Sequence, residues 1–299
     1  MRRPGPEQQT SRHSAEKMPE LEALNIGDAQ LPYLDFAGKS PAIIYLHATG
    51  FLPWLWQPVI EQIIPRFRSL APFICNYRPS DPEEGGLDWE VIAKDVAAFC
   101  RELKITDPLL VGHSMGATVL TIANALYGLQ ARGIVLIEPI FLPAAFYSMP
   151  LKLKDHPLAS RSIKRVNHWQ NEQEAWKYLR AKSLFAGWDE KALQIYFEFG
   201  MQKQKDGSLH LTCSPQCEAA LFMGGRFCNP WPLLSRISCP VLVLEGEASE
   251  NKKFVDIKRA VSLLSRGKYQ AVAAAGHLLP MQKPGDISEI IKEFSRQCI

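Results

Sequence analysis

The stretch Leu109-Leu110-Val111-Gly112-His113-Ser114-Met115-Gly116 decides the fold of this chain. Its first three residues are apolar and predict a short buried strand, and a serine then stands between two glycines. A serine on a sharp strand-to-helix turn has a strained backbone, so the residues two before and two after it must be small. Helix-forming residues follow from 117 to 129, which would point free N–H groups at the serine oxygen. The pattern therefore favours a nucleophile elbow over a tight turn with an inert serine.

Short apolar runs bounded by turn residues recur along the chain and are typical of buried parallel strands. They lie at residues 42–46, 71–75, 109–111, 134–137, 241–244 and 269–273. Helical patterns alternate with them at residues 89–103, 117–129, 254–264 and 287–296. This alternation predicts an α/β fold with a doubly wound, mostly parallel sheet.

The alternation stops between about residue 140 and residue 232, where residues 171–183 and 190–200 look helical and no strand candidate occurs. We expect a helical cap at 140–231, inserted into a core formed by 20–139 and 232–299. Its many aromatic residues could line an apolar pocket or pack the cap's own small core. Candidates for contact with a substrate are Trp54, His113, Phe146 and Trp188.

Composition narrows the function classes. The 299 residues are 46% hydrophobic and carry 34 basic and 31 acidic side chains, for a net charge of +3 that gives no case for nucleic-acid binding. The apolar stretch 133–151 contains Glu138 and several prolines, so we expect no membrane span there. Seven cysteines lack the paired spacing of a zinc site, which favours reduced, mostly buried thiols and no metal.

The first residues, 1–19, combine prolines and charges without an apolar core for a signal peptide, so we expect a disordered tail. A transit peptide is the alternative, but Glu7 and Glu16 count against it because such peptides are poor in acidic residues. We therefore expect a cytoplasmic protein. The sequence does not indicate its oligomeric state.

A serine nucleophile needs a base, a group that orients the base, and donors for the oxyanion. His277 follows the last predicted strand in a loop of small residues, where catalytic residues collect, and is the favoured base. The N–H of Met115 is the first expected oxyanion donor. The second should come from the loop after strand 42–46, at Thr49 or Phe51, and His47 would then brace this loop.

Together the His47-Ala48-Thr49-Gly50-Phe51 loop, the elbow, the helical insertion and the terminal Gly276-His277 resemble the alpha/beta-hydrolase superfamily over residues 20–299. The segment Glu138-Pro139-Ile140 narrows the resemblance to uncharacterised bacterial members. The resemblance implies a Ser-His-acid hydrolase that acts on esters or related acyl compounds.

The acid departs from the family's usual pattern, since Ser249 stands three residues after Gly246 where an aspartate is common. Some members carry the acid at the earlier strand end, which here is Glu138. A carboxylate that closes an apolar strand is costly to bury without a partner, and an imidazole N–H is a suitable one. Loop amides or an arginine of the cap are alternative partners, and Glu250 is the second choice for the acid.

These residues predict a serine hydrolase that cleaves a small acyl substrate through an acyl-enzyme, with no cofactor. Hydrolysis of a carbon–carbon bond and acyl transfer to another acceptor stay open. The serine argues against the dehalogenase and epoxide-hydrolase branches, which resemble this fold but use aspartate there. A ligand-binding or signalling protein on the same fold is the alternative from a different class.

Overall fold

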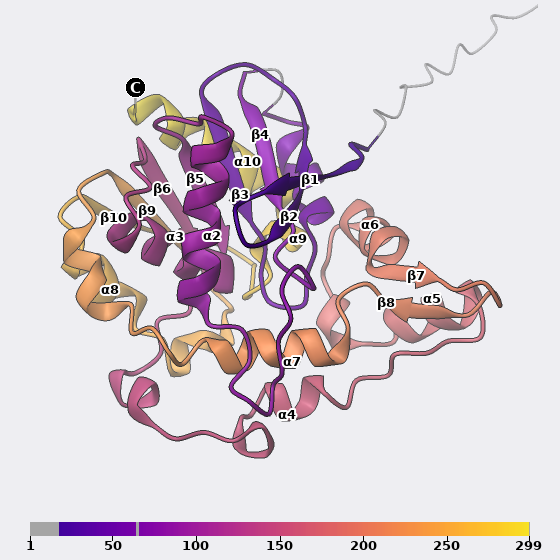
Figure 1. Ribbon diagram of the computed structural model, residues 1–299. Helices are drawn as coiled ribbons and strands as arrows, with labels where there is room; N and C mark the ends of the chain where they lie inside the picture. Colours follow the sequence, from indigo (N-terminus) through magenta and orange to yellow (C-terminus); the bar gives the residue numbers. More distant parts are fainter. Residues whose placement is uncertain (1–17, 64–65, 299) are drawn as a thin grey trace, which may run out of the picture.

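The computed structural model describes residues 18–63 and 66–298. Its centre is an eight-stranded sheet with the order β1-β2-β4-β3-β5-β6-β9-β10 (Figure 1). Strands β3 to β10 of this sheet pair in parallel, whereas β1 and β2 are antiparallel. The predicted doubly wound, mostly parallel sheet is confirmed. The strands are β1 (Leu21–Asn25), β2 (Gln30–Asp35), β3 (Ala42–Leu46), β4 (Arg68–Pro72), β5 (Leu109–His113), β6 (Gly133–Ile137), β9 (Val241–Gly246) and β10 (Gly267–Val272).

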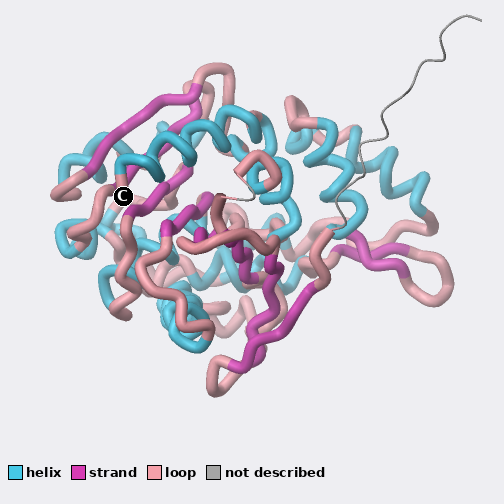
Figure 2. Tube along the Cα trace, turned by 90° about the horizontal axis from the view of Figure 1, so that it is seen from above, coloured by secondary structure: helices cyan, strands magenta, loops and turns pink. Residues whose placement is uncertain are grey.

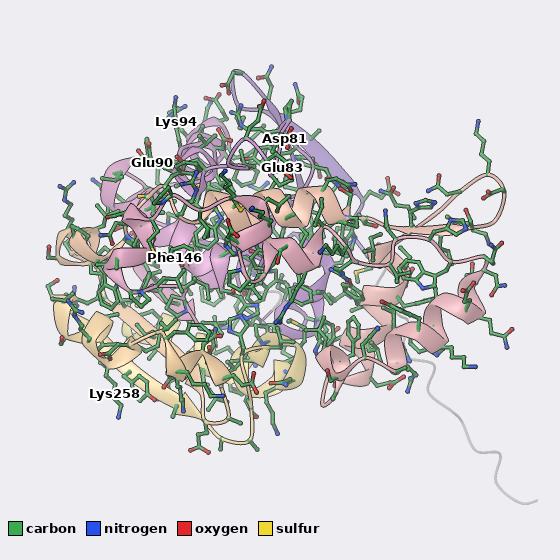
Figure 3. All side chains as sticks on the ribbon, turned by 90° about the horizontal axis from the view of Figure 1, so that it is seen from below. Asp81, Glu83, Glu90, Lys94, Phe146 and Lys258 are labelled. Carbon is green, nitrogen blue, oxygen red and sulfur yellow. The ribbon has the colours of Figure 1, made fainter. Side chains whose placement is uncertain are left out.

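Helices cover both faces of the sheet (Figures 1 and 2). On one face α2 packs against α3, while α10 lies on the other face and contacts the short α1. The inner strands are buried on both sides, which explains their continuous apolar runs. The helices of the core are α1 (Gln57–Ile60), α2 (Trp89–Glu102), α3 (Met115–Leu126), α8 (Ile257–Leu263), α9 (Leu279–Gln282) and α10 (Pro284–Gln297). Asp81 and Glu83, in the connection that leads to α2, lie on the same side of the molecule as Glu90 and Lys94 of that helix (Figure 3).

Three core features differ from the prediction. The run at 269–273 forms β10 at the edge of the sheet, where its side chains are mostly exposed or half-buried rather than buried. The strand predicted at 71–75 lies three residues earlier in the sequence, as β4 at 68–72. Residues 73–75 instead form a buried loop, in which the Ile74 N–H donates to His47 Nε2. The hairpin of β1 and β2 was not predicted, since β1 is mostly exposed and shows no apolar alternation.

The segment between β6 and β9 contains α4 (Ala159–Ser162), α5 (Glu172–Arg180), α6 (Glu190–Gly200) and α7 (Pro215–Gly224). It also contains an antiparallel ribbon of β7 (Met201–Lys203) and β8 (Leu209–Leu211), which projects at one side of the molecule (Figure 2). The expectation of no strand here is wrong, because strands of three residues are too short to show alternation. No helix within residues 18–63 and 66–298 is long and apolar enough to cross a bilayer. Most of the predicted tail lies outside the described residues.

Candidate active site

Ser114 lies at the carboxyl end of β5 and directly before α3, with φ 55° and ψ −118°. Such a conformation strains any residue except glycine. Glycine is required at positions 112 and 116 because backbone atoms of other residues approach both positions closely. A Cβ on Gly112 would lie 2.6 Å from the Cα of Ala117, and one on Gly116 would lie 2.4 Å from the carbonyl oxygen of Leu46. The elbow geometry thus follows from the spacing of the small residues.

His277 lies in the loop after β10 and reaches the elbow. Its Nε2 is 3.1 Å from Ser114 Oγ. The carbonyl oxygen of His277 accepts a 2.8 Å hydrogen bond from His113 Nε2, which fixes the backbone of the loop. Burial lowers the pKa of His113 to about 3, with a smaller contribution from the neighbouring His277. His113 is therefore neutral at pH 7 and serves as a donor.

Glu138 follows β6 with φ 50° and is 2% exposed. Its Oε2 lies 3.0 Å from His277 Nδ1. The Gly246 N–H donates to Oε1 at 2.8 Å, and the Ser249 hydroxyl donates to Oε2 at 2.8 Å. The carboxylate therefore bonds the imidazole and the loop after β9 at the same time. Glu250 is exposed, in the 3₁₀ helix η6 (Glu250–Lys253).

Asn251, for which the sequence shows no signal, lies beside both groups. Its Nδ2 is 2.8 Å from His277 Nδ1 and 3.5 Å from Glu138 Oε2. A protonated Nδ1 donates to Glu138 and cannot also accept from the amide, so Asn251 would then present its oxygen after a half-turn of the amide. The amide thus lies where it can select the tautomer of His277.

Among the described residues, two backbone N–H groups, one of the elbow and one of the loop after β3, make no hydrogen bond. Met115 is the first residue of α3, so its N–H has no acceptor within the helix. Among the described hydrogen bonds, the Thr49 N–H has no acceptor, whereas the Phe51 N–H donates to the Ala48 carbonyl at 3.1 Å. His47 braces this loop, because Nδ1 bonds the Ala48 carbonyl and Nε2 accepts from Ile74.

Comparison with known proteins matches residues 43–290 to the model of the alpha/beta hydrolase family. The chain belongs to this family. A 2-(acetamidomethylene)succinate hydrolase of Mesorhizobium japonicum is 26% identical to this chain over 215 residues. The matched region covers 71% of this chain and 73% of the relative. The predicted family and fold are confirmed, and named relatives are hydrolases.

Solved structures agree with this fold. A crystal structure of E-2-(acetamidomethylene)succinate hydrolase superposes with a TM-score of 0.78 at 22% identity, and covers 93% of this chain and 99% of the other. A thioesterase domain from the curacin biosynthetic pathway superposes with a TM-score of 0.73 at 17% identity, and covers 93% of this chain and 100% of the other. At such identities these structures show the fold alone.

The four predicted substrate contacts lie in different surroundings. Trp188 packs on Phe51 with ring centroids 5.7 Å apart, so it adjoins the loop after β3. His113 borders a small cavity of about 10 Å³ beside the same loop, room for about one water molecule. Trp54 stacks on Phe199 at 4.9 Å. Phe146 packs with its ring centroid 6.0 Å from that of His156. Contact of these four residues with a substrate stays a prediction.

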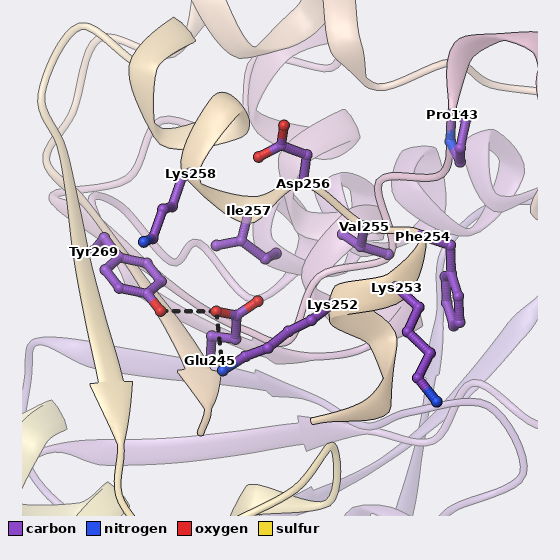
Figure 4. Close-up of a pocket in the computed structure, with 10 residues that line it drawn as sticks. All are labelled: Pro143, Glu245, Lys252, Lys253, Phe254, Val255, Asp256, Ile257, Lys258 and Tyr269. Carbon is purple, nitrogen blue, oxygen red and sulfur yellow. Dashed lines mark hydrogen bonds and ion pairs between the residues drawn. The ribbon is translucent and has the colours of Figure 1, made fainter. Parts of the chain in front are cut away.

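A larger cavity of about 540 Å³ lies between η6, α8 and β10 (Figure 4). Lys252, Lys253 and Lys258 line it, and Tyr269 Oη donates to Glu245 Oε2 at 2.7 Å. Burial and this carboxylate raise the pKa of Tyr269 to about 12. Neither Ser114 nor His277 lines this cavity, so it is separate from the candidate active site.

Proposed function

We propose that this hydrolase is a serine hydrolase with Ser114 as nucleophile, His277 as general base and Glu138 as the acid. The proposal rests on two consecutive hydrogen-bond contacts. Ser114 Oγ lies 3.1 Å from His277 Nε2, and His277 Nδ1 lies 3.0 Å from Glu138 Oε2. The three residues come from the carboxyl ends of β5, β10 and β6. In an open α/β sheet this edge is where ligands bind.

The mechanism follows from these positions. His277 takes the proton of Ser114 as the oxygen attacks an acyl carbonyl, and Glu138 stabilises the imidazolium that forms. The N–H groups of Met115 and Thr49 stabilise the oxyanion, and we favour Thr49 over Phe51 because the Phe51 N–H is already bonded. His277 then protonates the leaving group. Water attacks the acyl-enzyme in a second step with the same base.

We further propose that residues 140–231 form a cap that shapes the substrate pocket. Trp188 and Tyr196 pack on Phe51, the last residue of the loop that carries Thr49. Buried Glu218 of α7 lies so close to Gly50 that a Cβ there would be 2.7 Å from its Oε1. The aromatic surfaces favour an apolar acyl group on an ester or a related acyl substrate.

Turnover of a panel of p-nitrophenyl acyl esters tests the proposal, with labelling by a fluorophosphonate as a second readout. We expect Ser114→Ala to lower kcat/KM by about 10⁴-fold or more and to abolish labelling, because the nucleophile is lost. Ser295→Ala, a buried serine in α10, is the matched control and should label like the wild type. A wild type that neither hydrolyses esters nor reacts with the probe would favour a ligand-binding protein on this fold.

A further inference from the structure

Three cysteines from distant parts of the chain meet where the loop after β4 contacts α7. Cys75 belongs to that loop, Cys213 precedes α7, and Cys217 lies in the first turn of the helix. Their sulfur atoms all lie within 4.8 Å of one another. All three are free thiols and are buried. We call these residues the three-cysteine cluster; the proposed hydrolysis does not use it.

Two features of the structure favour negative charge on the sulfur of Cys217. The Asn76 N–H points at Cys217 Sγ at 3.2 Å. Cys217 also lies at the N-terminus of a ten-residue helix, where the helix dipole stabilises an anion. Thiolates are the form in which cysteine binds metals.

We propose that the three-cysteine cluster binds one soft, monovalent metal ion, Cu⁺. Because the sulfurs are at most 4.8 Å apart, an ion at their centre lies at most about 2.8 Å from each sulfur. An inward movement of at most about 0.5 Å per sulfur reaches about 2.3 Å, the distance typical of zinc–thiolate bonds. Rotation about the side-chain torsions of cysteine supplies such a movement. The site needs no rearrangement of the backbone.

The number of ligands selects the ion. Among the described residues, the cluster holds three sulfurs and no fourth histidine or carboxylate ligand. His47 lies nearby, but both of its ring nitrogens are engaged with backbone groups. Zn²⁺ in structural sites takes four ligands, whereas Cu⁺ is softer and accepts three sulfurs. The donor set therefore fits Cu⁺ better than Zn²⁺.

Binding would join the core to the inserted segment. Cys75 lies on the core side, and its thiol faces the carbonyl oxygen of Phe51 at 3.7 Å, whereas the other two sulfurs belong to the chain around α7. An ion that binds only the folded arrangement raises the melting temperature of the protein. This inference does not depend on the proposed hydrolysis.

The test is an anaerobic titration of the full chain with Cu⁺, in which a chromophoric chelator competes with the protein for the ion. A phosphine reductant keeps the thiols and the copper reduced. We expect one Cu⁺ per chain, with affinity at least tenfold weaker in Cys75→Ser and Cys217→Ser. Cys100→Ser, another buried free thiol, is the matched control and should bind like the wild type. A parallel titration with Zn²⁺ should show binding at least a hundredfold weaker than that of Cu⁺.

X-ray absorption at the copper edge of the wild type provides a measurement that does not need the variants to fold. Three sulfur neighbours at a single distance would support the site. The proposal is overturned if the chelator removes all copper, if Cys100→Ser weakens binding as much as Cys217→Ser, or if Zn²⁺ binds more tightly than Cu⁺.

Discussion

The ends of the core strands and the inserted segment are held in different ways. Around Ser114, a backbone group contributes to the position of each functional residue: Gly116 packs on the Leu46 carbonyl, the His277 carbonyl accepts from His113, and the Gly246 N–H donates to Glu138. The insertion between β6 and β9 depends more on side chains. Its aromatic rings pack in pairs, such as Trp176 on Phe197 at 4.8 Å and Phe185 on Trp188 at 5.0 Å.

We expect backbone contacts and side-chain packing to affect different properties of the protein, the reaction rate and the choice of substrate. Backbone contacts at strand ends hold reacting atoms within a few tenths of an ångström, which the proposed chemistry requires. Side-chain packing tolerates substitution more readily, so changes in the insertion need not disturb the geometry of the core. We therefore expect changes at the strand ends to affect the rate, and changes in the insertion to affect the choice of substrate.

We expect the largest difference between the strand ends and the insertion to appear in Glu138→Gln. Glutamine keeps the shape and can still accept from the Gly246 N–H, but its NH2 group would face the Ser249 hydroxyl and His277 Nδ1, from which it cannot accept. It therefore no longer stabilises the protonated His277. We expect kcat/KM for the best ester of the panel to fall by about 10³- to 10⁴-fold. Steady-state kinetics measures this fall, and thermal unfolding checks that the variant is folded.

Glu250→Gln is the matched change, because Glu250 lies in the neighbouring loop and is exposed. It should keep kcat/KM within about threefold of the wild type. A large loss in Glu250→Gln with little loss in Glu138→Gln would show that the acid comes from the loop after β9 and that the assignment of Glu138 is wrong.

The strand ends were largely predictable from sequence because their signals are local. Two glycines around a serine after an apolar run specify the turn, and a small-residue loop marks His277. The contact between Glu138 and His277 is different, since it depends on the pairing of β6 with β9, in which the Glu138 N–H donates to the Leu244 carbonyl at 2.9 Å. Burial cost favoured Glu138 in the sequence, but only the fold shows which carboxylate faces the imidazole.

Other features leave no local pattern. Asn251 lies in a short 3₁₀ helix, where the sequence does not distinguish it from an ordinary turn residue. The three-cysteine cluster joins positions far apart in the chain, so the spacing of its cysteines in the sequence does not predict that they meet. The ribbon of β7 and β8 is too short for periodicity. Such features arise from tertiary packing and need coordinates.

We expect an intermediate effect on the free energy of unfolding at acid pH. It compares buried histidines of the core with an exposed histidine of the insertion. Burial lowers the pKa of His47 to about 4 and that of His113 to about 3, against 6.5 for a free histidine. Below pH 6.5 the unfolded chain binds these protons and the folded chain does not, so stability present above pH 6.5 is lost as the pH falls. From pH 7 to pH 5 each histidine contributes a loss of up to about 2 kcal/mol.

Urea unfolding at pH 7 and pH 5 measures this loss. His113→Asn should reduce the loss by about 2 kcal/mol, because one of the two buried imidazoles is gone. His168→Asn removes an exposed histidine from the insertion and should leave the loss unchanged. Equal pH dependence in His113→Asn and the wild type would mean that the core histidines do not cause the acid sensitivity.

The smallest effect is expected from Asn251→Ala, which tests whether η6 belongs with the strand ends. The amide lies 2.8 Å from His277 Nδ1, and its loss frees the imidazole to turn away from Glu138. We expect kcat to fall about tenfold with KM nearly unchanged, since orientation of the base matters in the transition state more than in binding. Lys253→Ala, in the same 3₁₀ helix but exposed, should behave like the wild type. If Asn251→Ala instead raises KM and leaves kcat intact, the amide contributes to substrate binding, and η6 then resembles the insertion rather than the backbone-held core.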